Sequence, residues 1–194
     1  MRLLLAIAAL FLALPTQAQL RPFAFVPSGE DVWWLKKITL RPMSKSVGSH
    51  SLSALNGWRA RDGVAAEPFC FVDAYRLDAI ISPDRETELQ IREYLARRGA
   101  DQFSQDFTPS PGMRFNATIG AYETCDGESG AMLIVTDLAS GAIALIHEVE
   151  EPFRYLLPAD GKTVAISSCF ECGDINRLYL DISRRRFYWE YEGD

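Results

Sequence analysis

Residues 132–149 read MLIVTDLASGAIALIHEV, and this stretch decides the fold class. Two apolar segments rich in Ile, Leu and Val are separated by DLASG, residues 137–141, a run of turn-forming residues. Short apolar segments joined by a short glycine-containing connection are typical of a β-hairpin. Residues 178–191, LYLDISRRRFYWEY, repeat the arrangement around a polar turn at 183–186. We therefore predict a mainly β (α+β) fold of small antiparallel sheets.

The two hairpins align with each other at an offset of 44 residues. Asp137 falls on Asp181, Ile143 on Phe187 and Cys125 on Cys169, while residues 134–136 fall on 178–180. A period of about 40–50 residues with several strands per unit is a feature of propeller blades. We therefore expect tandem β repeats at about 113–150 and 157–194.

The second unit resembles a blade of a WD-type or TolB-type β-propeller. The resemblance rests on PADGKTVAI at 158–166, LYLDI at 178–182 and FYW at 187–189. A closed propeller has at least about four blades, whereas this chain offers two such units. The resemblance therefore implies blade-like sheets that form a small sandwich, with one helix packed on a side.

The upstream region contains one predicted helix, at about 83–98. Ser82 suits the N-cap, Pro83 suits the first helical position, and Gly99 suits the left-handed residue after the last turn. Strands are predicted at 31–40, with a short helix as the alternative, and at 67–77, where Phe69 and Phe71 share one face. Residues 19–30 are predicted to be an extended arm. The Ser- and Gly-rich residues 41–57 are predicted to form a long loop.

The first eighteen residues have the layout of a secretory signal peptide. A basic start at Arg2 precedes an apolar run of 12 residues at 3–14, and small residues lead to a cleavage site after Ala18. This run is shorter than the about 20 residues that a membrane-spanning helix needs. We expect a single β-rich domain over 19–194, periplasmic or extracellular, with no stable membrane insertion after cleavage of the leader.

The charge and the cysteines restrict the class of partner. The chain carries 20 basic and 26 acidic residues, for a net charge of −6, which argues against a nucleic acid partner. Cys70, Cys125, Cys169 and Cys172 are the disulfide candidates, because an oxidising compartment favours pairing. The repeat favours Cys125–Cys169 with Cys70–Cys172. Cys70–Cys125 with Cys169–Cys172 is the alternative, and the sequence leaves both open.

No motif in the sequence predicts catalysis. His50 lies in the Ser-rich stretch and His147 follows an apolar run, and no metal-binding, phosphate-binding or nucleophile-elbow motif accompanies them. We therefore predict no catalytic, cofactor or metal site. The clustered acids are predicted to form a solvated rim: Asp126, Glu128, Glu148, Glu150 and Glu151.

Two short motifs retain a functional interpretation. Cys169 and Cys172 form a CxxC that is typical of redox-active pairs when it lies at a helix N-terminus, but here it lies between a strand and a turn. Arg184, Arg185 and Arg186 form a run of three guanidinium groups that suits a carboxylate or sulfate.

The sequence as a whole predicts a non-enzymatic binding protein, such as an inhibitor or immunity-type protein acting on an envelope protein. The alternatives are a thiol–disulfide redox protein using Cys169 and Cys172, and an envelope-structural protein without a dedicated ligand. The last strand is predicted to present a free edge to which another chain adds a strand. The predicted partner contacts are Trp189, Tyr191, Arg184, Arg185 and Arg186.

Overall fold

The structure, a computed structural model, describes residues 23–24, 39–42, 44–59, 68–77, 80–81, 89–90, 92–93, 96–97, 102–149, 155–157, 160–167 and 175–192. None of the helices in these residues has the length and apolar character needed to cross a membrane. In chain order the elements are β1 (Phe23–Ala24), β2 (Thr39–Pro42), β3 (Ser46–Val47), β4 (His50–Ser51), α1 (Leu52–Gly57), β5 (Phe71–Arg76), β6 (Ile80–Ile81), β7 (Ser104–Ser110), β8 (Met113–Thr124), β9 (Ser129–Asp137), β10 (Ile143–Val149), β11 (Tyr155–Leu157), β12 (Val164–Ser167), β13 (Ile175–Asp181) and β14 (Arg186–Glu192).

The predicted mainly β fold of small antiparallel sheets is confirmed. A large sheet has the strand order β10-β9-β8-β5, with β7 also paired to β8, and a C-terminal sheet has the order β11-β12-β13-β14. Smaller pairings join β1 to β2 and β6, and β3 to β4. Every strand pair in the described residues is antiparallel.

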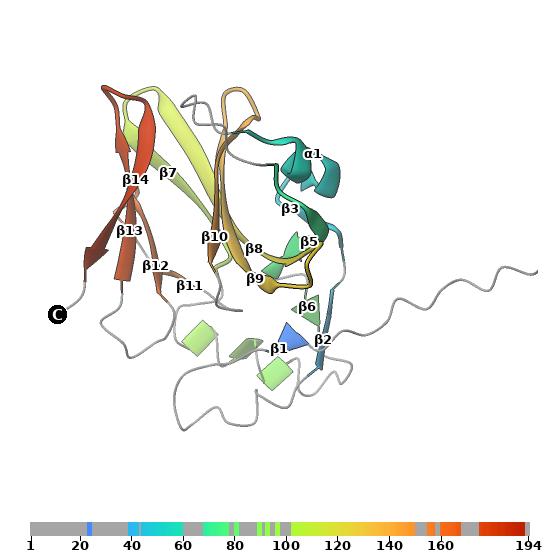
Figure 1. Cartoon of the computed structure of the whole chain (residues 1–194). Coiled ribbons are helices and arrows are strands. Elements are labelled where there is room, and N and C mark those ends of the chain that lie inside the picture. The colour runs from blue at the N-terminus through green and yellow to red at the C-terminus, as the bar shows by residue number, and fades with distance from the viewer. Residues whose placement is uncertain are drawn as a thin grey trace, which may run out of the picture.

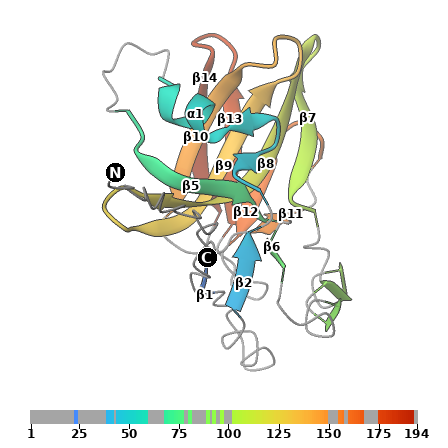
Figure 2. The same ribbon diagram turned by 90° about the vertical axis from the view of Figure 1, so that its right-hand side faces the viewer.

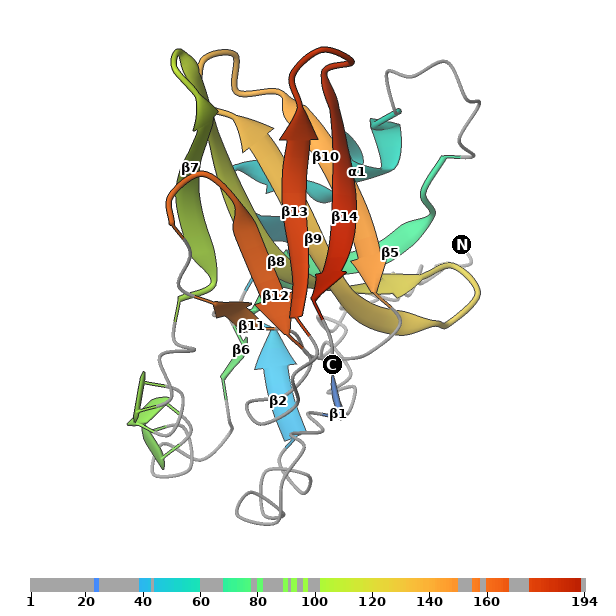
Figure 3. The same cartoon turned by 90° about the vertical axis from the view of Figure 1, so that its left-hand side faces the viewer.

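The large sheet and the C-terminal sheet pack face to face (Figures 1 and 3). One apolar cluster joins them, and in it Leu133 and Val135 of β9 and Leu178 of β13 are almost completely buried. Aromatic rings also meet across the gap, since the rings of Phe115 and Phe187 have centroids 5.3 Å apart. Burial of this apolar surface is the main force that holds the two sheets together.

The predicted long loop at 41–57 is wrong. The structure forms the β3–β4 hairpin and the helix α1 there, and these elements cover the other face of the large sheet (Figure 2). Val47 and Leu55 are both 0% exposed and pack with Met132 and Ile134 of β9. The helix begins at an N-cap, because the Ser51 side chain accepts a hydrogen bond from the backbone of the first turn. The large sheet is therefore the middle of three layers.

Side chains in and next to α1 bond to β5 and β10, two of the outer strands of the large sheet. The Asn56 amide bonds twice to the backbone of Phe71 in β5, donating to its carbonyl at 2.9 Å and accepting from its N–H at 2.8 Å. The Trp58 indole donates to the carbonyl of Ile143 in β10 at 3.1 Å. These bonds occupy polar backbone groups that an edge strand otherwise leaves to solvent.

The structure joins Cys70 to Cys125, so the pairing of Cys125 with Cys169 is wrong. The two cysteines precede and follow Phe71 and Thr124, which face each other between β5 and β8. The pairing depends on this long-range strand register, and an internal repeat carries no information about it. Cys169 and Cys172 lie outside the described residues.

Several other predictions also fall on residues that the structure does not describe. They include the leader at 1–18, most of the arm at 19–30, in which the described residues Phe23–Ala24 form β1, and most of the strand at 31–40. Of the helix predicted at 83–98, residues 89–90, 92–93 and 96–97 are described, and all six are helical and exposed. At 67–77 the described strand is β5, in which Phe71 is buried and Val72 is exposed.

The strands β8-β9-β10 and β12-β13-β14 have the same order and the same turn chemistry. Thr136 pairs with Ile143 across the first turn, and Leu180 pairs with Phe187 across the second, each 44 residues later. The two units also stack in the same orientation, because Leu133 and Val135 of the first unit contact the core face of the second. The resemblance to propeller blades stays a prediction.

Candidate binding surface on the C-terminal sheet

One face of the C-terminal sheet packs on the core, and the opposite face, called here the outer face, carries polar and aromatic side chains. On β13 the buried Leu178 alternates with Arg177 and Tyr179. On β14 the half-buried Phe187 and Trp189 alternate with exposed residues. Because successive side chains of a strand point to opposite faces, the outer face is formed by every second residue. On these two strands it consists of Ile175, Arg177, Tyr179, Asp181, Arg186, Tyr188, Glu190 and Glu192.

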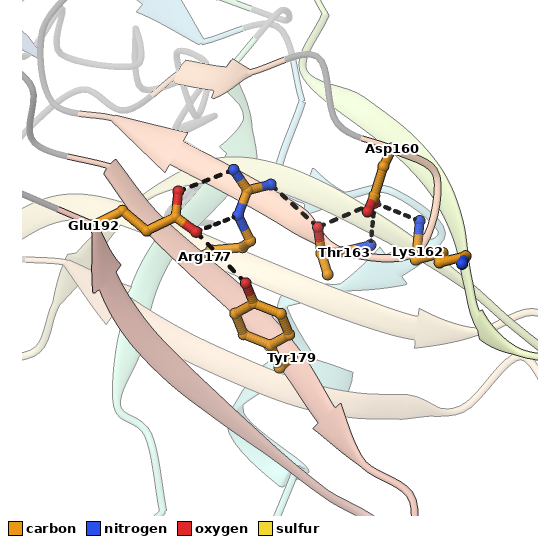
Figure 4. Close-up of polar contacts among 6 residues, drawn as sticks. All are labelled: Asp160, Lys162, Thr163, Arg177, Tyr179 and Glu192. Atoms are coloured by element: carbon orange, nitrogen blue, oxygen red, sulfur yellow. Dashed lines mark hydrogen bonds and ion pairs between the residues drawn. The ribbon is translucent and has the colours of Figure 1, made fainter.

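A hydrogen-bonded chain of five side chains fixes the polar part of this face (Figure 4). Arg177 donates to both carboxylate oxygens of Glu192, from Nε at 2.7 Å and from Nη2 at 3.0 Å. Its Nη1 donates to the Thr163 hydroxyl at 3.2 Å, which in turn donates to Asp160 at 3.2 Å. The Tyr179 hydroxyl donates to Glu192 at 3.5 Å. A bidentate Arg–carboxylate pair of this kind restricts both side chains to one geometry.

The charges of this network stabilise one another. The hydrogen bond from Arg177 lowers the pKa of Glu192, and the same bond raises the pKa of Arg177. The backbone N–H of Lys162 donates to Asp160 at 2.8 Å and lowers the pKa of that carboxyl. At neutral pH the network therefore contains two carboxylates and one guanidinium in fixed positions.

Two tyrosine rings lie next to this network. Tyr179 and Tyr188 pair across β13 and β14, and their rings stack with centroids 5.6 Å apart and planes 19° apart. Partial desolvation and the nearby Glu192 raise the pKa of Tyr179. Tyr188 is 43% exposed, and Tyr191, three residues further along β14 and on its opposite face, is 66% exposed. Exposed aromatic rings of this size are more common at protein interfaces than elsewhere on a surface.

The β13–β14 turn forms a shallow pocket beside Tyr188, lined also by Asp181, Arg184 and Arg186. Asp181 accepts hydrogen bonds from the Ser183 backbone at 2.9 Å and from the Ser183 hydroxyl at 2.6 Å. The hydroxyl bond lowers the pKa of Asp181. The Arg184 guanidinium is 80% exposed and lies 3.7 Å from this carboxylate. Among the described residues, two guanidinium groups and one carboxylate line the pocket.

Of the predicted contacts, Arg184 and Arg186 line the pocket, and Arg185 lies in the same turn without lining it. Tyr191 lies on the face of β14 opposite the outer face, where it is exposed. Arg185 has a positive φ of 52° and allows the chain to reverse there. Trp189 is on the core face, where its ring lies 4.8 Å from that of His147, so the core contains most of this side chain.

Sequence reasoning missed the network of Arg177 and Glu192 and the stacked Tyr179. The alternation of apolar and polar residues in RLYLD at 177–181 and RFYWEYE at 186–192 was the available signal, since it places these residues on one face. No group of three or more His, Cys, Asp or Glu residues suited to a metal ion occurs in the described ranges. The chain matches no protein-family model, no curated protein and no solved structure.

Proposed function

We propose that the protein is a non-enzymatic binding protein that acts outside the cytoplasm and contacts a protein partner through the outer face and β14. The observation that carries the proposal is the exposure of Tyr188, which lines the arginine pocket of the β13–β14 turn, and of Tyr191 on the same strand. An inhibitor or immunity-type protein that blocks an envelope enzyme is the form of this function we favour.

The compartment is supported by the disulfide. A bond between Cys70 and Cys125 persists in oxidising compartments such as the periplasm and the extracellular space. The predicted leader at 1–18 leads to the same location. Envelope and secreted proteins are therefore the partners to test.

The side chains of the outer face suit recognition for two physical reasons. Arg177 and Glu192 already satisfy each other, so a partner meets fixed polar groups and little side-chain freedom is lost on binding. Tyr188 adds apolar area and a hydroxyl at a position that solvent reaches. A fixed polar rim around exposed aromatic rings is the usual composition of a protein interface.

A polar outer face also has a simpler explanation, because the last unit of a stacked array needs a soluble surface. That explanation accounts for Arg177 and Glu192 but not for two exposed tyrosines. The proposal is therefore tested at the tyrosines rather than at the charges.

The experiment is affinity capture from an envelope extract of the source cells, with wild-type protein and two variants immobilised at equal density. Tyr188→Ala should reduce capture of the partner at least about fivefold, because it removes a central aromatic contact. Leu138→Ala is the matched control, since Leu138 is 40% exposed in the β9–β10 turn, outside the proposed contact surface. Equal capture by all three, or no retained protein, would contradict the proposal.

The disulfide pattern also supports a second candidate function, a thiol–disulfide redox role. Because Cys70 and Cys125 are joined, Cys169 and Cys172 are the two cysteines left to form a CxxC pair. A redox role requires this pair to open under mild reduction while the fold persists. A reduction potential below about −300 mV, which is typical of structural disulfides, would exclude that role.

A further inference from the structure

The edge of β14 has different contacts from the edges of β5 and β10, two outer strands of the large sheet. At Phe71 the edge of β5 is bonded by the Asn56 amide, and at Ile143 one carbonyl of β10 accepts from the Trp58 indole. β14 ends the order of the C-terminal sheet, and in the described part of the chain its only strand partner is β13. An edge strand of this kind offers backbone donors and acceptors to another strand.

The outer-face residues of β14 follow a charge order along the strand. Arg186 comes first, beside Arg184 in the pocket of the turn, then the exposed Tyr188, then the exposed Glu190. Alternate residues of a strand are about 6.5–7 Å apart, so these positions match every second residue of an added strand. The order is therefore positive, aromatic, negative.

Charged residues on an edge strand often serve only to prevent aggregation. An edge with that role alone has no need of exposed aromatic rings, which promote pairing. Here Tyr188 and Tyr191 are exposed on opposite faces of β14. Exposed aromatic rings together with opposite charges in a fixed order favour binding of one kind of partner segment. They are not expected of an edge that only prevents aggregation.

We propose that β14 binds an extended segment of a partner protein by antiparallel strand addition, and that this segment carries a basic, an apolar or aromatic, and an acidic residue at alternate positions from its N- to its C-terminus. Antiparallel addition places the C-terminal acid of the segment against Arg186 and the pocket, and the N-terminal base against Glu190. Every strand pair in the described residues is antiparallel, and this pairing is the more stable per residue. The inference rests on the proposed function and specifies the chemistry of the partner.

The probe is the acetylated and amidated peptide TKVYVDT, titrated into ¹⁵N-labelled protein and followed by amide chemical shifts. Its control is TDVYVKT, which has the same composition and the reverse charge order. We expect shifts on β14 and at least about tenfold weaker binding of the control, because like charges directly opposite in a sheet are destabilising. Equal affinity of the two peptides, or no shifts on β14 at millimolar peptide, overturns the inference.

Two variants with the same change of charge locate the contact. Arg186→Glu should weaken binding of TKVYVDT about tenfold and should strengthen binding of TKVYVKT. The substituted carboxylate would then lie opposite the lysine at the sixth position of that peptide. Arg185→Glu is the matched control, because Arg185 lies in the same turn without lining the pocket. An equal effect of Arg185→Glu, or no rescue by TKVYVKT, contradicts the assigned contact. If Tyr188→Ala abolishes partner capture while the peptides fail to discriminate, the inference fails and the proposed function stands.

Discussion

Removing the Cys70–Cys125 disulfide should cost about 4 kcal/mol of folding free energy. The two cysteines are 55 residues apart in the sequence. In the chain-entropy treatment, closing a loop of that length lowers the entropy of the unfolded chain enough to contribute about 4 kcal/mol at 25 °C. The perturbation is the double substitution Cys70→Ser and Cys125→Ser, which leaves Cys169 and Cys172 unchanged.

The assay is urea unfolding followed by tryptophan fluorescence. With a slope of about 2 kcal/mol per molar urea, a loss of about 4 kcal/mol lowers the unfolding midpoint by about 2 M. A non-reducing peptide map of the wild-type protein, made first by mass spectrometry, should contain the peptide pair that joins Cys70 to Cys125. Wild-type protein in reductant is the control for effects of the serines themselves.

Two results would refute this reasoning. A loss below about 1 kcal/mol would mean that the cross-link does not restrict the unfolded chain as the loop length requires. A peptide map joining Cys125 to Cys169 would mean that the repeat, and not the β5–β8 register, determines the pairing.

Three further predictions test the packing around the large sheet. Leu55→Ala should cost about 3 kcal/mol in urea unfolding, because Leu55 is fully buried; a loss under about 1 kcal/mol would mean that α1 is not docked. Gly120→Ala should cost about 1–3 kcal/mol, since its Cβ would lie 2.6 and 2.8 Å from the Val47 methyls, and Val47→Ala should recover part of the loss. Burial lowers the pKa of His50, so the folded state resists protonation and stability should fall as the pH drops below about 6.5; His50→Gln should flatten the urea midpoint between about pH 7 and pH 5.

The strands after residue 113 were predictable because their turns are marked by residues with local roles. Asp137 accepts hydrogen bonds from the backbone N–H groups of Ala139 and Ser140, and Asp181 does the same for Ser183 and Arg184. Such turns form from a few neighbouring residues and depend little on the rest of the chain. The repeat at 44 residues follows from the same local chemistry.

The layer formed by β3, β4 and α1 was not predictable in the same way. Its anchors Val47 and Leu55 are separated by mostly small and polar residues, and α1 is only six residues long. A helix of that length has little stability of its own and forms because the large sheet buries Leu55. Six residues are too few to show the apolar periodicity that identifies a longer helix in a sequence.

The candidate surface was predictable only in part for a related reason. The arginines of the turn are adjacent in the sequence and are visible as a run. Arg177 and Glu192 are 15 residues apart and meet because β13 and β14 pair in one register. A shift by one residue would move each side chain to the opposite face, so the contact exists only once the pairing is fixed.

The stacking of the two units explains why a polar surface occurs where it does. Leu133 and Val135 in β9 face the C-terminal sheet and are buried, while the residues 44 positions later, Arg177 and Tyr179, face outward. The strand order is the same at both places, and the side chains differ. A face with leucine and valine requires another sheet to cover it, whereas a face with a paired arginine and a stacked tyrosine is stable in water and remains accessible to a partner. In the proposed function, the second unit therefore presents the binding surface.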